Sequence, residues 1–346
     1  MEKWGFRNSC FLFVGLMLLI LYFLISPVLA HVPVFEEDGK SPGEAIPVED
    51  PLKSRVLYGE LEGGGNARYY SFEMEKGERI LLGLIVPVKP GNRVFAPDLV
   101  LMGPGLADEG KVPKTLEIPE GNGVKMLPGK LPESATYEGF SPSAFYSLAR
   151  LDLEAPESGT YYAAVASPAR DVNYGIVLGY RESFSLKEWV LVPLGQIRTY
   201  RWEGQSLPFI LAPLGLTLAA GVLAVLRKKE KGSMFTPAQW AGAFASLFFL
   251  GTGLSFLVQM LVSLNRSAYS PEVFITLFLG FSHLALGVAA MGLSLKGSGY
   301  GENGTKKRLY FFGLAFTGLL LWAGWLIGPL LAFEAGLLPW GRKKWS

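Results

Sequence analysis

Four long apolar runs after residue 205 constrain this chain more than any other feature. They cover Leu207–Leu226, Pro237–Leu264, Val273–Leu295 and Tyr310–Phe333. Each reaches the roughly 20 residues that a helix needs to cross the hydrocarbon core of a bilayer. The sequence therefore predicts an integral membrane protein with an α-helical bundle of four transmembrane spans over residues 206–336, followed by a basic tail over residues 337–346.

The amino-terminal segment, residues 1–30, has the composition of a signal peptide. Lys3 and Arg7 precede an apolar stretch, and Val28-Leu29-Ala30 supplies small residues before a cleavage site. The apolar stretch is long for a signal and short for a span, so an uncleaved signal anchor is the alternative. In both cases the chain that follows is expected to face outward.

Residues 31–205 predict an extracytoplasmic β-sandwich domain. Short β-rich runs alternate with Gly, Pro, Asn and Asp at the spacing typical of a sandwich. The segment Ile80–Pro87 is almost wholly apolar, as in a strand of the core. The Gly/Pro-rich stretch from Leu106 to Phe140 predicts a loop or a pair of irregular edge strands.

The charge distribution indicates how the spans are oriented. Residues 31–205 hold 25 acidic and 18 basic residues, and the other segments hold 5 acidic and 14 basic residues. Basic residues after the first and third apolar runs would face the cytoplasm, which follows the positive-inside rule. Four spans place Arg342, Lys343 and Lys344 outside, against that rule, so the side of the tail stays open.

The β-rich domain resembles the pre-peptidase C-terminal domain, a jelly-roll type of β-sandwich. The motifs that carry the resemblance are "LYGELEGGGNARYYSFEMEKGERILLGL", "PDLVLMGPG", "ESGTYYAAV" and "NYGIVLGY", between Leu57 and Tyr180. The matching positions are Tyr70, Phe72, Gly77, Asp98, Leu99, Leu101, Gly159, Thr160, Tyr161, Tyr162 and Tyr174. The resemblance implies a non-catalytic module of secreted or surface proteins with a role in binding or secretion. The usual context differs, since a membrane region follows the module here.

The residue inventory argues against most enzyme classes. Cys10 is the only cysteine and lies in the predicted signal, and only two histidines are present. Disulfide frameworks, cysteine-ligated metals and cysteine nucleophiles therefore drop out. No spacing singles out a catalytic pair, and we predict neither an enzyme nor a cofactor.

His31 is the first candidate ligand. Cleavage after Ala30 makes it the amino-terminal residue, and a terminal histidine can hold copper through its amine and ring nitrogen. The predicted ectodomain offers no second histidine. A polar start to the domain is therefore the competing interpretation.

His283 is the second candidate, because it lies near the middle of the third apolar run. Ionisable groups at that depth are costly and often functional. A hydrogen bond to Ser282, Gln259 or Thr252 would satisfy a neutral imidazole without any further role. Both interpretations stay open.

We therefore predict a multi-pass protein of the cell membrane that displays a binding or sensing β-sandwich outside. Its expected partners are the lipid bilayer and an envelope or surface protein or glycan, and nucleic acid is not expected. The alternative is a protein that handles a small ligand or metal ion, with copper at His31, or that assists transport through the bundle.

Overall fold

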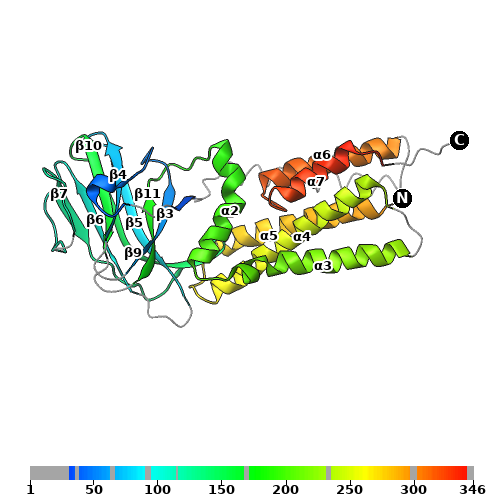
Figure 1. The fold of residues 1–346 in the computed structure, drawn as a ribbon, viewed down its shortest axis with the longest axis horizontal. Coiled ribbons are helices and arrows are strands. Elements are labelled where there is room, and N and C mark those ends of the chain that lie inside the picture. Colours follow the sequence, from blue (N-terminus) through cyan, green and yellow to red (C-terminus); the bar gives the residue numbers. More distant parts are fainter. Residues whose placement is uncertain are drawn as a thin grey trace.

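The computed structural model describes residues 31–35, 39–62, 67–89, 95–113, 116–166, 171–230, 235–296 and 302–340. The predicted signal peptide and residues 341–346 of the predicted tail lie outside this part of the chain. Strands occupy one end of an elongated molecule and helices the other (Figure 1). In chain order the described elements of the first half are β1 (Val32–Phe35), η1 (Pro42–Glu44), β2 (Ile46–Pro47), β3 (Arg55–Leu61), β4 (Ala67–Met74), β5 (Arg79–Pro87), β6 (Asp98–Gly103), β7 (Gly123–Leu127), β8 (Thr136–Glu138), β9 (Ser143–Glu154), β10 (Gly159–Ala166) and β11 (Val172–Leu178).

The strands form two mixed sheets. One has the order β1-β3-β11-β5-β9-β8 and the other the order β2-β4-β10-β6-β7. The pairs β1–β3 and β2–β4 are parallel, and the remaining pairs are antiparallel. The apolar strand β5 pairs with β11 and β9 inside its sheet, as expected for a strand buried on both faces. The stretch after Leu106 contributes the short strands β7 and β8, which confirms its prediction.

One apolar core joins the two sheets. Leu57 and Leu84 from the first sheet and Phe72 and Leu101 from the second belong to the same buried cluster. Within this core the Tyr70 and Tyr174 hydroxyl oxygens lie 2.9 Å apart and share a hydrogen bond. Because each buried hydroxyl has a partner, the aromatic rings fill the core without leaving a polar group unpaired.

Gly103 shows how the glycines make room for these rings. A Cβ atom at this position would lie 2.1 Å from the Tyr161 ring. The Tyr161 hydroxyl continues past the glycine and donates to the Pro104 and Glu157 carbonyl oxygens. Burial of tyrosines in this way removes most of the predicted aromatic positions from the surface of the domain.

The helices follow as α2 (Leu186–Trp202), α3 (Leu207–Glu230), α4 (Pro237–Leu264), α5 (Val273–Leu295), α6 (Glu302–Leu320) and α7 (Ile327–Leu337). Three of them, α3, α4 and α5, are long and apolar enough to cross a membrane. They coincide with the first three predicted spans, so a membrane-spanning region is supported. The short helix α2 lies between the sheets and the bundle (Figure 1), where no helix was expected.

The fourth predicted span, Tyr310–Phe333, is not a continuous helix. The chain turns between α6 and α7, and Trp322, Gly324 and Trp325 in this turn have φ angles of 54°, 68° and 53°. Such positive angles are incompatible with a right-handed helix. Pro329 adds to the break, since it lacks the N–H that would bond to the Trp325 carbonyl in a continuous helix.

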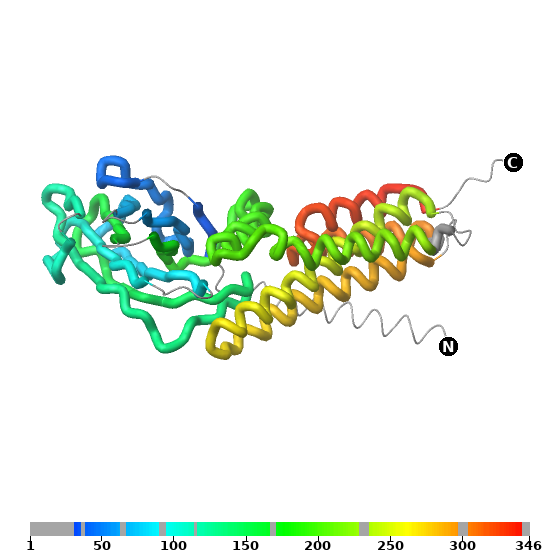
Figure 2. The backbone as a smooth tube through the Cα atoms, turned by 60° about the horizontal axis from the view of Figure 1, so that its bottom comes forward, coloured from blue at the N-terminus to red at the C-terminus, as the bar shows by residue number. Residues whose placement is uncertain are grey.

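The helices α6 and α7 instead form a hairpin that returns to its starting end. Arg308 near the start of α6 donates to the carbonyl oxygens of Gly336 and Leu337, at 2.8 and 2.9 Å. Phe311 stacks on Trp340 with ring centroids 5.1 Å apart. Figure 2 shows the hairpin beside the other helices, and Figure 1 places the ends of α3 and α7 at the same end of the bundle.

This arrangement predicts that the carboxyl terminus lies on the same membrane side as the end of α3. We expect a single cysteine at Ser346→Cys, in a Cys10→Ala background, to be protected from an impermeant maleimide on intact cells, as Arg227→Cys is. The residue Tyr269, in the loop between α4 and α5, is 71% exposed, and Tyr269→Cys should show the opposite accessibility. If Ser346→Cys behaves like Tyr269→Cys, the chain crosses the membrane a fourth time.

Candidate binding site at the domain junction

The helix α2 connects the sheets to the bundle. It begins with a capping box, in which Ser185 and Glu188 pair with each other's backbone N–H groups. At its other end the Trp202 indole donates to the Tyr174 carbonyl at 3.0 Å, and Asn173 donates to the Trp202 carbonyl at 3.0 Å. The capping box that starts α2 is a local sequence signal, whereas the contacts of its last residue with β11 depend on the tertiary fold.

The loop between β8 and β9 makes a second connection, directly to α5. The Tyr137 and Thr276 hydroxyl oxygens are 2.7 Å apart, and the Gly139 N–H donates to a Glu272 carboxylate oxygen at 3.1 Å. Gly139 allows this close approach, because a Cβ atom there would lie 2.3 Å from the Glu272 carbonyl oxygen. The loop between α4 and α5 lies beside the sheets in Figure 2 for the same reason.

A third connection centres on Trp322 in the turn of the α6–α7 hairpin. Its ring lies 4.1 Å from the Trp189 ring and 5.1 Å from the Phe140 ring, measured between centroids. Its indole N–H donates to the Trp189 carbonyl at 2.7 Å. That carbonyl is available because Pro193, four residues on in α2, has no N–H to donate to it.

This contact makes a prediction about stability. Trp322→Phe leaves the Trp189 carbonyl without a donor, which should cost about 1–3 kcal/mol and lower the melting temperature of the full chain in lipid nanodiscs. Pro193→Ala restores a backbone N–H at that position. We therefore expect Pro193→Ala to stabilise the Trp322→Phe background more than it stabilises the wild type, measured as a double-mutant cycle by circular dichroism. Equal gains in both backgrounds would mean that the indole does not replace the missing amide.

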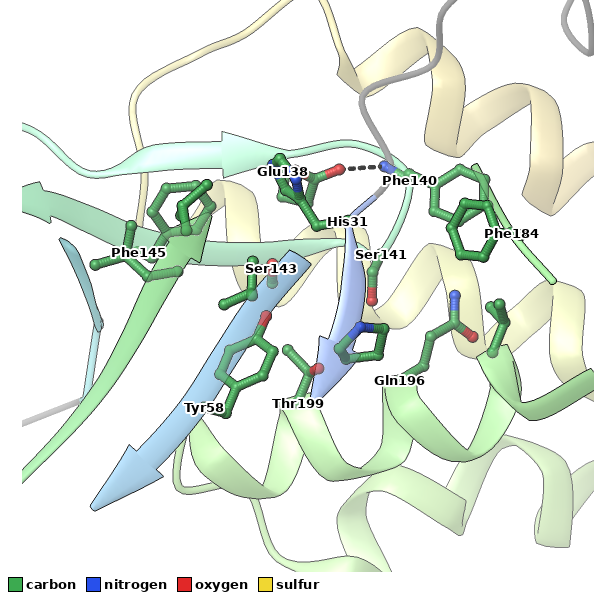
Figure 3. Close-up of a pocket in the computed structure, with 15 residues that line it drawn as sticks. His31, Tyr58, Glu138, Phe140, Ser141, Ser143, Phe145, Phe184, Gln196 and Thr199 are labelled. Atoms are coloured by element: carbon green, nitrogen blue, oxygen red, sulfur yellow. Dashed lines mark hydrogen bonds between the residues drawn. The ribbon is translucent and has the colours of Figure 1, made fainter. Parts of the chain in front are cut away.

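A cavity of about 80 Å³ lies between the first sheet and α2. Apolar groups such as Pro33, Ile85 and Val192 line much of it, together with the rings of Tyr58, Phe140, Phe145 and Phe184. Polar side chains enter it from both sides, namely His31, Glu138, Ser141, Ser143, Gln196 and Thr199. Figure 3 shows Glu138 on the strand side and Gln196 on the α2 side of this space. Mostly apolar walls with a few convergent polar groups are typical of small-molecule sites.

Two of these polar groups are energetically unusual. Burial, with the nearby charge of Glu272 as the second cause, raises the pKa of Glu138 to about 8. One Glu138 oxygen accepts the Phe140 N–H at 3.0 Å. Gln196 is 8% exposed, and its amide nitrogen has no hydrogen-bond partner. A buried donor left unpaired is destabilising, so the Gln196 amide has no stabilising hydrogen bond within the protein and is available to a ligand.

The raised pKa predicts a specific pH dependence of stability. A carboxyl that keeps its proton up to about pH 8 when folded, against about 4.5 when unfolded, stabilises the fold less as the pH rises between these values. Glu138→Gln removes this loss. We expect its melting temperature to exceed that of the wild type at pH 9 and to match it near pH 5, while the exposed Glu133→Gln has no such effect. A Glu138→Gln difference that does not grow with pH would contradict the assignment.

The structure places the predicted ligand His31 at the wall of this cavity. Its Nδ1 shares a hydrogen bond with the Ser54 hydroxyl, and burial lowers the pKa of the ring. Within the described ranges, no group of three or more His, Cys, Asp or Glu side chains is positioned to hold a metal ion. Copper binding through His31 stays a prediction.

The structure places His283 inside the bundle, where it supports the hairpin turn. Its Nε2–H donates to the Leu321 carbonyl at 2.8 Å, and its ring lies edge-on to Phe256. The partner is thus a backbone carbonyl rather than the predicted Ser282, Gln259 or Thr252. Thr252 contributes to the same turn, because its hydroxyl accepts the Gly324 N–H at 2.8 Å.

The sequence analysis did not identify Glu138 or Gln196 as site residues. Glu138 ends a three-residue strand in a stretch predicted as a loop or a pair of irregular edge strands, and Gln196 lies in a helix that the sequence analysis does not predict. The Ser185-x-x-Glu188 capping box was the available signal for that helix. Nothing local in the sequence indicates that the two residues face one cavity.

Comparison with known proteins does not assign this chain to a family. No protein family and no curated protein matches the chain. The resemblance to pre-peptidase C-terminal domains therefore stays a prediction that rests on the motifs alone.

Proposed function

We propose that this chain is a membrane-anchored receptor without catalytic activity, in which a jelly-roll type domain outside the cell binds a small ligand or an envelope component. The bundle then registers that binding, because the domain is docked on the helices rather than tethered to them. The observation that best supports this proposal is a ring contact at the junction. Trp322, in the turn of the hairpin, packs between Trp189 of α2 and Phe140 of the β8–β9 loop. Any shift of that loop or helix is transmitted directly to the turn of the hairpin.

The distribution of charge supports the orientation of the receptor. Arg227 ends the apolar part of α3, Lys296 follows α5, and Arg308 lies near the start of α6. The carboxyl ends of α3 and α5 and the start of α6 lie at the end of the bundle away from the sheets (Figure 1). Positive residues favour the cytoplasmic side, so the sheets belong outside the cell membrane. With the hairpin in place of a fourth span, the basic tail obeys the same rule.

The hairpin turn has the properties of an element that can report such a shift. Its positive φ angles at Trp322 and Trp325 store strain of about 1–3 kcal/mol each. The turn is held by hydrogen bonds from Thr252 and His283 and by the contact with Trp189. Loss of the contact to the domain therefore changes the stability of the turn.

Hydrogen exchange of the full chain in nanodiscs tests this coupling. Gly139→Ala forces the β8–β9 loop away from Glu272, because its Cβ atom would overlap the Glu272 carbonyl oxygen. We expect exchange at residues 321–326 to rise about tenfold, which corresponds to roughly 1.4 kcal/mol of local stability. Gly43→Ala is the matched control, since nothing lies within 4 Å of its Cβ position.

The outcome that would overturn the proposal is equally specific. If Gly139→Ala folds and leaves exchange at 321–326 unchanged, the domain and the hairpin are not coupled. In that case the helices serve as an anchor only. Exchange that rises equally in Gly43→Ala would show a general loss of stability instead of transmission through the junction.

A further inference from the structure

The junction cavity has the electrostatic character of a cation site. Glu138 is the one acidic side chain that lines it, and among the described lining residues none is Lys or Arg. Burial lowers the pKa of the His31 imidazole and so disfavours its charged form. Among the described lining side chains, a bound cation would therefore meet the carboxyl group of Glu138 and no Lys or Arg.

The aromatic lining favours an organic cation over a metal ion. Tyr58, Phe140, Phe145 and Phe184 line the cavity together with Glu138, and Figure 3 shows their rings at both ends of it. Aromatic faces attract ammonium groups through the negative potential above the ring. Metal ions such as Mg²⁺ and Ca²⁺ require several oxygen ligands instead, and no cluster of such ligands is present within the described residues.

The unpaired amide nitrogen of Gln196 specifies a second feature of the ligand. It is a buried donor on the α2 side, opposite Glu138 in Figure 3. A ligand that carries a hydrogen-bond acceptor next to its ammonium group would satisfy both residues at once. The size limit follows from the volume of about 80 Å³, which holds roughly three water molecules, or a compound of about four or five non-hydrogen atoms.

We propose that the junction cavity binds a small primary-ammonium compound, with the ammonium group at Glu138 among the aromatic rings and an acceptor oxygen at Gln196. This inference deepens the proposed receptor function and rests on it for its physiological meaning. The same chemistry is available from a free amino alcohol or from an ethanolamine lipid headgroup.

Calorimetry on the full chain tests the proposal directly. In nanodiscs made of phosphatidylcholine, we expect ethanolamine to bind, and its neutral isostere ethylene glycol to bind at least tenfold more weakly. Ethylamine, which lacks the acceptor, should bind several-fold more weakly than ethanolamine. Glu138→Gln should reduce ethanolamine affinity at least tenfold, and Gln196→Met should abolish the preference over ethylamine. The exposed Glu133→Gln is the matched control and should bind normally.

A pH titration of the wild type provides an independent arm that needs no variant. Glu138 gains its charge only above about pH 8, so affinity should fall as the pH drops from 8.5 to 6. The groups that influence this titration are Glu272 just before α5, Glu182 before α2, Tyr58 on β3 and Tyr137 on β8, and His31 lines the same cavity. Affinity that is independent of pH over this range would contradict a role for Glu138.

A comparison of lipids distinguishes the two sources. If the headgroup is the ligand, nanodiscs that contain phosphatidylethanolamine should weaken the apparent affinity for free ethanolamine. If the free compound is the ligand, the two lipid compositions should give the same affinity. Both results support the ammonium site.

The proposal is overturned if ethanolamine does not bind, or if it binds no better than ethylene glycol, which would indicate a cavity for ordered water only. This failure is separate from a failure of the receptor proposal. Calorimetry measures occupancy of the cavity, whereas exchange at residues 321–326 measures its transmission to the hairpin.

Discussion

The hydrogen bond from the Trp322 indole to the Trp189 carbonyl is the interaction on which the architecture depends. Pro193 frees that carbonyl by interrupting the hydrogen bonding of α2, and the indole from a distant part of the chain takes the vacant place. A part-buried carbonyl without a donor is costly, so the bond favours one relative placement of helix and hairpin. The rings of Trp189 and Phe140 then enclose the indole and bring the outer domain into the same contact.

The predictability of the fold follows from how local each signal is. The β-rich character of residues 31–205 and the helices α3, α4 and α5 are predicted because composition, length and turn residues encode them locally. The fourth span failed because hydropathy does not register backbone conformation, and the turn depends on positive φ angles at Trp322 and Trp325. Those angles are held by Thr252 and His283 from other helices, which no local pattern shows. The local signal for α2 is its Ser185-x-x-Glu188 capping box, which hydropathy does not register.

The candidate site was less predictable than the fold for the same physical reason. Glu138 and Gln196 reach one cavity only after β8 and α2 have packed on the same sheet. His31 was singled out from its place after the predicted cleavage site, and it does lie at that cavity. The sequence draws attention to His31 only because it follows the predicted signal peptide. The residues that surround it in the cavity are brought there by the tertiary fold.

The contacts of the buried ionisable side chains indicate which of them serve the fold and which line the proposed binding site. His283 in the bundle has its Nε2–H committed to the Leu321 carbonyl, so its position is explained by the hairpin turn. Glu203 is similarly accounted for, because it accepts hydrogen bonds from Ala144 and Gln205 at the end of α2. Glu138 likewise accepts a hydrogen bond, from the Phe140 N–H, but it also lines the junction cavity, opposite the unpaired amide nitrogen of Gln196. A positive charge with an adjacent acceptor oxygen would interact favourably with the carboxyl group of Glu138 and the amide nitrogen of Gln196. Glu138 and Gln196 are therefore the two residues on which the proposed ligand chemistry of the junction rests.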